Sequence, residues 1–213
     1  MNLIKPHLEH KSHIIWDWNG TLLNDVTACV GVISEILREH DLPEISEAQY
    51  RAQFRFPIAE YYKSLGFDFS KTSLAMLSDK FVTRYKPRAM ACSLFDGARE
   101  LLATLHGSGI PMSILSAANE AELKELTRHH QIDHYFGRLC GLSDFYAASK
   151  IERGRELIAE LGIEVDEIIL VGDTDHDLEV ARALGVDALI LADGHQSYER
   201  LQPLHSRVFA CRY

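Results

Sequence analysis

Positive charge is scarce in this sequence. Lys and Arg number 22 against 31 Asp and Glu, which gives a formal net charge of −9. A chain without a basic excess offers no broad surface to polyanions, so we predict that it binds neither nucleic acid nor an anionic membrane. A small anionic ligand remains compatible with this charge, because a few local cations or a metal ion reverse the field inside a cleft.

Cysteine and long apolar runs are scarce as well. The four cysteines are scattered along the chain without a Cys-x-x-Cys pair: Cys29, Cys92, Cys140 and Cys211. This pattern argues against a disulfide framework and favours a reducing compartment. Residues 1–12 lack the apolar segment of a signal peptide, and no later run has the length of a membrane-spanning helix. We therefore predict a soluble, cytoplasmic protein, either a monomer or a homodimer.

The apolar pattern indicates an α/β fold. The chain has 213 residues and 46% apolar side chains, enough for one α/β domain with an insertion. From residue 96 onward, helical segments alternate with short apolar runs, which is typical of βαβ units in a doubly wound parallel sheet. The predicted strands are residues 14–16, 111–115, 138–142, 167–171, 188–191 and 208–210.

Residues 24–88 differ from the rest, because they show helical periodicity and no strand signal. Four helices are predicted, over about 24–40, from 46, over 57–64 and over 70–85, and residues 86–88 close the set. Asn24 and Asp25 are suitable caps for the first helix. We predict an α/β core of residues 1–23 and 89–213, with residues 24–88 inserted after the first strand as an all-helical cap.

Polar side chains follow several of the predicted strands. Asp17 ends the first, Ser116 the second, and Asp173 the strand of residues 167–171, while Lys150 begins a helix. The carboxyl ends of parallel strands share one edge of a sheet, so we expect these groups to meet in one crevice. Acidic groups that meet there require a cation, and hard oxygen ligands suit Mg²⁺. A hydroxyl and an ammonium beside such a metal favour a phosphoryl group.

Four segments resemble the motifs of the haloacid dehalogenase superfamily, in its phosphatase branch with a small helical cap. Residues 17–22, Asp-Trp-Asn-Gly-Thr-Leu, resemble the first motif, D-x-D-G-T-L. Ser116 and Lys150 resemble the second and third motifs, and residues 172–177 resemble the fourth, G-D-T-x-x-D. The first and fourth motifs are specific in this order, whereas a single Ser or Lys is weak evidence. By general resemblance, phosphoglycolate phosphatases are the nearest group within the branch.

The resemblance implies a mechanism and a set of site residues. Asp17 would attack phosphorus and form an aspartyl-phosphate, with Lys150 keeping it ionised. Mg²⁺ would be held by Asp17, the backbone carbonyl of Asn19 and Asp173, and Asp177 would bind or orient its water shell. The phosphoryl oxygens would be bound by Ser116, Lys150 and backbone N–H groups that include those of Gly20, Thr21 and Ala117. The implied substrate is a small phosphorylated metabolite.

Residue 19 departs from the family pattern, which usually has an Asp there as general acid and base. An amide cannot exchange a proton, and such proton transfer is typically worth about 10²–10⁴-fold in rate. If the protein is an enzyme despite Asn19, it is a slow one, it uses another acid and base such as His176, or its substrate has a good leaving group that needs little protonation. It is alternatively a silent phosphate-binding protein, or Asn19 deamidates to restore the acid. Sugar-phosphate mutases and phosphonate hydrolases are further relatives to consider.

Substrate contacts from the cap are the weakest predictions. Arg55 starts a predicted helix where this branch often carries a specificity loop, so it is the first candidate, followed by Arg51 and Lys63. Such residues more often cover a solvated helix face. Trp18, next to Asp17, either lines the substrate pocket or packs beneath the cap. The eleven histidines lack the spacing of a zinc site.

Overall fold

The computed structural model describes residues 3–142, 150–192 and 194–210. The described strands form one six-stranded sheet in the order β3-β2-β1-β4-β5-β6, and neighbouring strands in it run parallel. The strands are β1 (His13–Trp16), β2 (Met112–Asn119), β3 (Arg138–Leu142), β4 (Ile168–Gly172), β5 (Asp187–Leu191) and β6 (Val208–Phe209). The predicted α/β class with a parallel sheet is therefore confirmed.

Strand β1 lies in the middle of the sheet, between β2 and β4, and all four of its residues are buried. Successive side chains of a strand point to opposite faces. Ile14 and Trp16 accordingly pack in one apolar cluster, whereas Ile15 packs in the cluster on the other face. A continuous apolar run is needed here because helices cover both faces.

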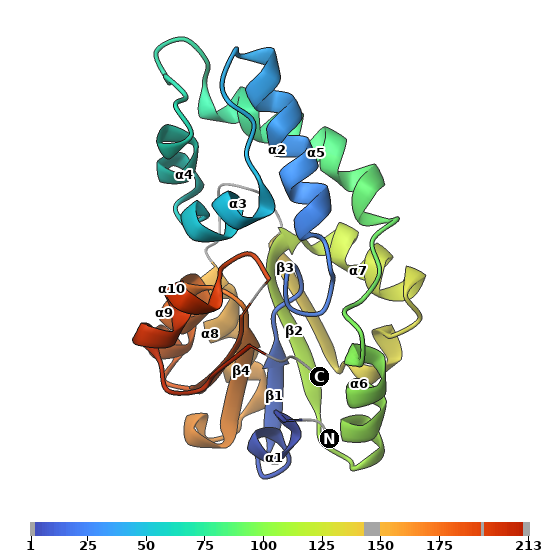
Figure 1. Ribbon diagram of the computed structural model, residues 1–213. Helices are drawn as coiled ribbons and strands as arrows, with labels where there is room; N and C mark the ends of the chain where they lie inside the picture. The colour runs from blue at the N-terminus through green and yellow to red at the C-terminus, as the bar shows by residue number, and fades with distance from the viewer. Residues whose placement is uncertain (1–2, 143–149, 193, 211–213) are drawn as a thin grey trace.

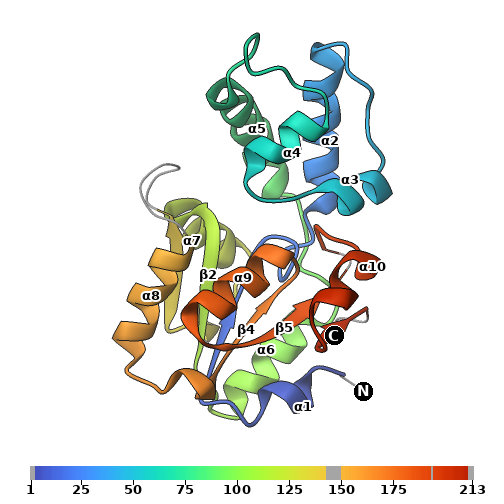
Figure 2. The same ribbon diagram turned by 90° about the vertical axis from the view of Figure 1, so that its left-hand side faces the viewer.

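Helices cover both faces of the sheet (Figures 1 and 2). The Ile14 face packs against α1 (Lys5–Leu8), α6 (Ala98–Gly107) and α7 (Glu120–His129). The Ile15 face packs against α8 (Lys150–Leu161), α9 (Asp175–Leu184) and α10 (Tyr198–Leu201). The two apolar clusters thus fill the faces of the sheet. The carboxyl ends of the strands are left free of this packing, so polar side chains can lie there.

Residues 26–89, which form the first part of the connection between β1 and β2, make a second body above that edge, drawn at the top of Figure 1. Its helices are α2 (Val26–Glu39), α3 (Glu47–Gln53), α4 (Ile58–Ser64) and α5 (Leu74–Ala89). They enclose an apolar cluster of their own, in which Ile36, Tyr61 and Leu77 are fully buried. This cluster gives the cap a core distinct from the two clusters of the sheet.

Several element boundaries differ from the sequence expectation. Helix α5 continues through Pro87, where the prediction ended it at residue 85. A proline in the last turn removes one N–H donor, yet the packing of α5 against α2 holds the helix. Strand β2 extends to Asn119, and the short helix α1 was not expected. Among the described helices, none is long and apolar enough to cross a membrane. Cys211 lies outside the described residues.

Candidate active site

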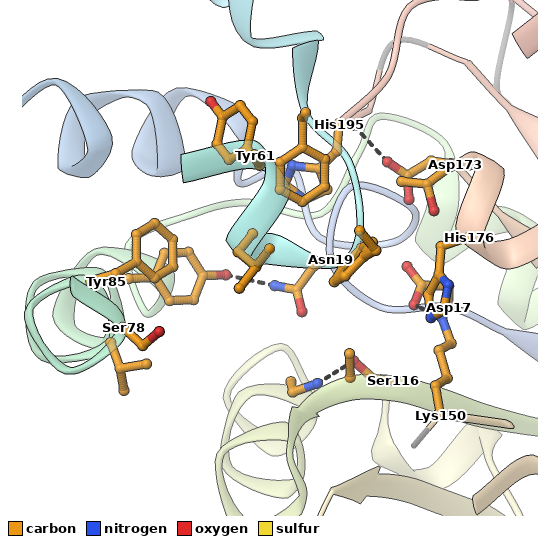
Figure 3. Close-up of a pocket in the computed structure, with 18 of the residues that line it drawn as sticks. Asp17, Asn19, Tyr61, Ser78, Tyr85, Ser116, Lys150, Asp173, His176 and His195 are labelled. Carbon is orange, nitrogen blue, oxygen red and sulfur yellow. Dashed lines mark hydrogen bonds and ion pairs between the residues drawn. The ribbon is translucent and has the colours of Figure 1, made fainter. Parts of the chain in front are cut away.

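Asp17 occupies the end of the central strand. Its backbone N–H donates to the carbonyl of Val171 at 2.8 Å, which prolongs the β1–β4 ladder by one residue. Its side chain is 7% exposed and accepts two hydrogen bonds. Lys150 Nζ lies 2.5 Å from Oδ1, and Figure 3 shows these two side chains next to each other. Thr21 Oγ1 donates to Oδ2 at 3.2 Å. A carboxylate with both oxygens engaged is held in one orientation at the mouth of the sheet.

Asp173 and Asp177 come from the loop after β4 and the first turn of α9. Thr174 caps α9 in a capping box: its hydroxyl oxygen accepts from the Asp177 N–H, and Asp177 Oδ2 accepts from the Thr174 N–H at 3.0 Å. The second oxygen of Asp177 faces Lys150 Nζ at 2.7 Å. Thr21 Oγ1 lies 3.0 Å from Asp173 Oδ1, so one hydroxyl connects the first and fourth motifs. The structure therefore brings the predicted Asp17, Lys150, Asp173 and Asp177 together.

Gly20 permits this close approach. Its φ is +69°, a conformation that other residues adopt only with strain. A Cβ at this position would also collide with the side chains of Asp173 and His195. The glycine of the first motif is thus required by the packing of the loop against the carboxylate of the fourth.

The carboxylates of this site are not balanced by protein cations. Burial and the neighbouring carboxylates raise the pKa of Asp17 to about 7, although Lys150 acts in the opposite direction. The pKa of Asp177 is lowered, because the charge of Lys150 outweighs the effect of burial. Asp17 and Asp177 in turn raise the pKa of Lys150, so it stays an ammonium. One ammonium therefore serves several buried carboxylates.

These donors fit a hard divalent cation. One carboxylate oxygen from each of Asp17, Asp173 and Asp177 lies within 4.8 Å of the others, and all three residues are buried. Oxygen donors of this kind suit Mg²⁺. A cation among them would counter both causes of the raised pKa of Asp17, its burial and the charge of the neighbouring carboxylates.

A second buried cluster, around Asp25, lies beside the first and was not predicted from the sequence. Asp25 was expected to cap α2, but its side chain makes no capping hydrogen bond. Its carboxylate instead accepts from the Gly20 N–H at 2.9 Å, Asn19 Nδ2 at 2.9 Å and the Tyr85 hydroxyl at 2.6 Å. His195 first, and then Tyr85 and Asn19, lower the pKa of Asp25 and outweigh the opposite effect of its burial.

His195 completes this cluster. It follows β5, its Nε2 lies 3.4 Å from Asp25 Oδ1, and its backbone N–H donates to Asp173 Oδ2 at 2.6 Å. Burial lowers the pKa of His195, but the nearby carboxylates, Asp25 above all, outweigh it and raise the pKa to about 9. The Tyr50 hydroxyl contacts Nδ1 at 2.8 Å. Asp17 and Asp173 were predicted because polar residues that follow parallel strands meet at one edge of the sheet. The same reasoning, applied to β5, would have predicted His195.

The predicted phosphate contacts differ in their placement. Ser116 and Ala117 line the cavity at the end of β2, and the Ser116 hydroxyl accepts from the Ala118 N–H at 3.1 Å. The Gly20 N–H is directed instead to the Leu23 carbonyl and the Asp25 carboxylate, and the Thr21 N–H to the Trp18 carbonyl. Gly20 and Thr21 therefore shape the loop, and Thr21 orients carboxylates through its hydroxyl.

The predicted cap contacts are not brought to the site. The Arg55 side chain is exposed and donates to the Gln53 carbonyl. Arg51 binds Glu47 and the Gly194 carbonyl, and the exposed Lys63 pairs with Glu60. Trp18 is fully buried in the sheet cluster. None of these four side chains is among the described residues that line the cavity.

A cavity of about 290 Å³ lies between the core and the cap. Asp17, Ser116, Lys150 and Asp173 line its core side, and His176 and His195 lie near them. Helices α3, α4 and α5 supply most of the opposite wall. Asp17, the candidate nucleophile, thus lies at the core end of a partly open cavity, and the cap covers the opposite end.

Hydrogen bonds hold α3 of the cap against the core loop after β5. Gln196 Nε2 donates to the Phe54 carbonyl at 3.0 Å and to Asp175 Oδ1 at 2.7 Å. Arg200 donates to the same carbonyl and pairs with Asp175 at 2.7 Å. The cap is therefore fastened to the first turn of α9, next to the carboxylate cluster.

The sequence matches the model of a family described as "Haloacid dehalogenase-like hydrolase" over residues 14–191. The chain belongs to this family. The match covers the strands and helices that supply the carboxylate cluster, apart from the first residue of β1, and the expected family is confirmed.

Curated relatives of this chain have diverse names. "Tyrosine-protein kinase PtkA" of Mycobacterium tuberculosis is 26% identical over 185 residues, which cover 85% of this chain and 62% of that protein. The chain thus spans less than two thirds of PtkA. A phosphoglycolate phosphatase of Rhodospirillum rubrum is 25% identical, with 85% and 80% of the two chains covered.

Solved structures show the same fold. A haloacid dehalogenase-like family hydrolase from Streptococcus pneumoniae superposes with a TM-score of 0.80 at 19% identity and covers 93% of both chains. The structure of Mycobacterium tuberculosis PtkA gives 0.76 at 24% identity, with 89% of this chain and 88% of that one covered. At identities below 25%, this structural similarity establishes the fold. Any inference about the reaction has to come from the residues of the site.

Proposed function

We propose that this hydrolase cleaves small phosphomonoesters through an aspartyl-phosphate on Asp17 and that it requires Mg²⁺. The observation that carries the proposal is the buried Asp17 carboxylate, held by Lys150 and Thr21 beside two further carboxylates. The relatives named phosphoglycolate phosphatase favour a small phosphorylated metabolite as the substrate here too. A cytoplasmic location and a monomeric or dimeric state remain predictions.

In the first step, an Asp17 oxygen attacks phosphorus, and the bond from phosphorus to the ester oxygen breaks. Lys150 lowers the pKa of Asp17 against the effect of burial, and Lys150 and the Ser116 hydroxyl on β2 would bind the phosphoryl oxygens. Asp17, Asp173 and the backbone carbonyl of Asn19 would hold Mg²⁺, which supplies neutralising charge to the phosphoryl group, while Asp177 would act on its water shell.

In the second step, water attacks the phosphorus of the aspartyl-phosphate, and the Asp17 carboxylate is released. The Asn19 amide donates to Asp25 and Tyr85, and Figure 3 shows its oxygen pointing away from Tyr85. That oxygen is able to orient a water molecule but not to take its proton. The proton passes to the departing phosphate, so we expect hydrolysis of the phosphoenzyme to be the slow step.

Burst kinetics test this proposal. With p-nitrophenyl phosphate and Mg²⁺, we expect a burst of about one nitrophenolate per enzyme followed by slow turnover. Quenched samples analysed by peptide mass spectrometry should show one phosphoryl group on Asp17, and the same spectra show whether Asn19 is intact. Asp17→Asn should abolish the burst, the label and the turnover.

The main alternative is a silent phosphate-binding protein. It predicts binding of phosphate with Mg²⁺ but neither burst nor label, and Asn19→Asp would then restore turnover from near zero. A mutase would transfer the label to a second hydroxyl of a sugar phosphate instead of releasing phosphate. A phosphonate hydrolase would need an amine near the phosphoryl site to form an imine, and from the described cap no lysine lines the cavity.

A further inference from the structure

The cavity above Asp17 has one polar end and one apolar end. Apolar and aromatic side chains of the cap line the far end, chiefly Phe54, Ile58, Tyr61, Tyr62, Phe81 and Val82. Among the described residues, the cap contributes no lysine or arginine to this lining. A substrate that reaches into the cap therefore meets hydrocarbon and aromatic rings.

Aromatic rings on two sides of the cap line the apolar end of the cavity. Phe81 and Tyr85 stack on α5 with ring centroids 5.4 Å apart and planes 12° from parallel. Phe54 and Tyr61 meet edge to face, at 5.3 Å, on the α3–α4 side. Figure 3 shows Tyr85 and Ser78 on one side of Asn19, with Asp17 and Lys150 on the other. A ring attached to a phosphoryl group at Asp17 would pass Asn19 and reach the rings of the cap.

A carboxylate on the substrate would be poorly accommodated there. Glu122 lines the same cavity and adds negative charge, and it lies 3.4 Å from the ammonium of Lys86, its ion-pair partner. The cavity cations, Lys150 and His195, are already paired with carboxylates at the core side. A buried anion without a paired cation is strongly disfavoured. Phosphoglycolate, which carries such a carboxylate, is therefore a poor fit.

Asn19 gives a second, independent reason to expect a substrate whose leaving group departs without being protonated. Both protons of its amide are accounted for by acceptors: Asp25 Oδ2 lies at 2.9 Å and Tyr85 Oη at 2.6 Å. Residue 19 thus offers the leaving oxygen neither a proton nor a hydrogen bond. A phenol has a pKa of about 10, whereas an aliphatic alcohol lies near water, at about 16. An aryl oxygen leaves as an anion far more readily.

We propose that the substrate is a monophosphate ester of a phenol, whose aromatic ring binds between α5 and the α3–α4 side of the cap. The proposal rests on the proposed function, because it specifies the ester that Asp17 cleaves. The Asp17 oxygen forms a bond to phosphorus, the bond to the aryl oxygen breaks, and the phenolate departs with the electron pair. Solvent water protonates the phenolate after its release.

Binding of stable analogues tests the pocket without turnover. Isothermal titration of the Mg²⁺-loaded protein compares benzylphosphonate, which carries an arene, with phosphonoacetate, which carries a carboxylate. We expect benzylphosphonate to bind at least about tenfold more tightly, as burial of a ring in an apolar wall favours it. Equal binding, or tighter binding of phosphonoacetate, would overturn the proposal.

A matched pair of variants locates the ring. Phe81→Ala should weaken benzylphosphonate binding by about tenfold and leave phosphonoacetate binding nearly unchanged. Phe69→Ala is the control, because Phe69 is also a partly buried cap phenylalanine but does not line the cavity. Equal effects of the two variants would place the ring elsewhere and contradict the proposal. Circular dichroism checks that both variants are folded.

Leaving-group dependence of kcat/KM tests the chemistry on the parent protein. Phenyl phosphate should exceed n-butyl phosphate by at least about 10³-fold, and Asn19→Asp should reduce this ratio by at least tenfold, because a proton donor helps the alkoxide most. If butyl phosphate or phosphoglycolate is cleaved as well as phenyl phosphate, the aryl proposal is wrong while the phosphatase stands. If no ester is cleaved and Asp17 is never labelled, both proposals fail together.

Discussion

Asp17 and Asp25 lie at the two ends of one loop between β1 and α2, and both are buried, yet their pKa values move in opposite directions. Asp17 shares a single ammonium with another carboxylate, whereas Asp25 collects a backbone N–H, an amide, a phenol and an imidazole. Asp17, whose charge is only partly compensated, is suited to bind a metal ion and to act as a nucleophile. Asp25, whose hydrogen bonds are provided by the protein, is suited to position its neighbours. Partners, and not burial, distinguish the two.

The largest expected difference between these two carboxylates is in catalysis. Asp17→Asn should lower kcat by at least about 10⁴-fold, because an amide cannot form the aspartyl-phosphate. Asp25→Asn should lower it by only about tenfold, through looser placement of Asn19. Initial rates with p-nitrophenyl phosphate and Mg²⁺ measure both. Comparable losses in the two variants would mean that Asp25 takes part in the chemistry.

Removal of the shared ammonium should affect stability next most. Lys150→Met leaves buried carboxylates without their counter-charge, and we expect the free energy of unfolding to fall by about 3 kcal/mol without Mg²⁺. Saturating Mg²⁺ should restore part of this loss. Lys124→Met is the control, since Lys124 is 41% exposed and pairs with Glu120 one helical turn away; its loss should cost about 0.5 kcal/mol. Urea unfolding measures both, and an unaltered Lys150→Met midpoint would contradict the charge imbalance.

Mg²⁺ affinity should depend on pH through Asp17. A proton occupies a carboxylate whose pKa is about 7 in the metal-free protein, so it competes with the metal below that pH. The dissociation constant for Mg²⁺ should rise by about tenfold per unit as pH falls below about 7 and should level off above it. Calorimetric titrations across this range measure the effect. In Asp17→Asn the slope should flatten, and a constant affinity in the parent would refute the assignment.

The smallest effect should come from a single hydroxyl. Tyr85→Phe removes the donor to Asp25 and the acceptor for Asn19, and should lower the free energy of unfolding by about 1 kcal/mol. Tyr61→Phe is the matched control, because the buried Tyr61 hydroxyl has no hydrogen-bond partner in the described part of the chain. Its loss should be neutral or slightly stabilising. Thermal unfolding that ranks these two variants in the reverse order would contradict the role of the Asp25 cluster.

Much of the sheet could be predicted because its signals are local. The apolar run of residues 14–16, the glycines of the loops and the acidic start of α9 each specify a strand end or a helix start from neighbouring residues. Asp17 and Asp173 follow from the rule that parallel strands share an edge. The cap contacts could not be found this way. Arg55 resembled a substrate ligand by position, but the α3–α4 turn directs it to solvent.

The class of fold, the family and the carboxylates at the ends of β1 and β4 follow from the amino-acid sequence, since adjacent residues encode strands, turns and caps. The partners of each carboxylate depend on the three-dimensional packing. Asp25 meets Tyr85 and His195 across 60 and 170 residues of chain, because the cap folds back over the sheet edge. Such contacts depend on how two separate apolar cores pack against each other, and no local pattern records that arrangement.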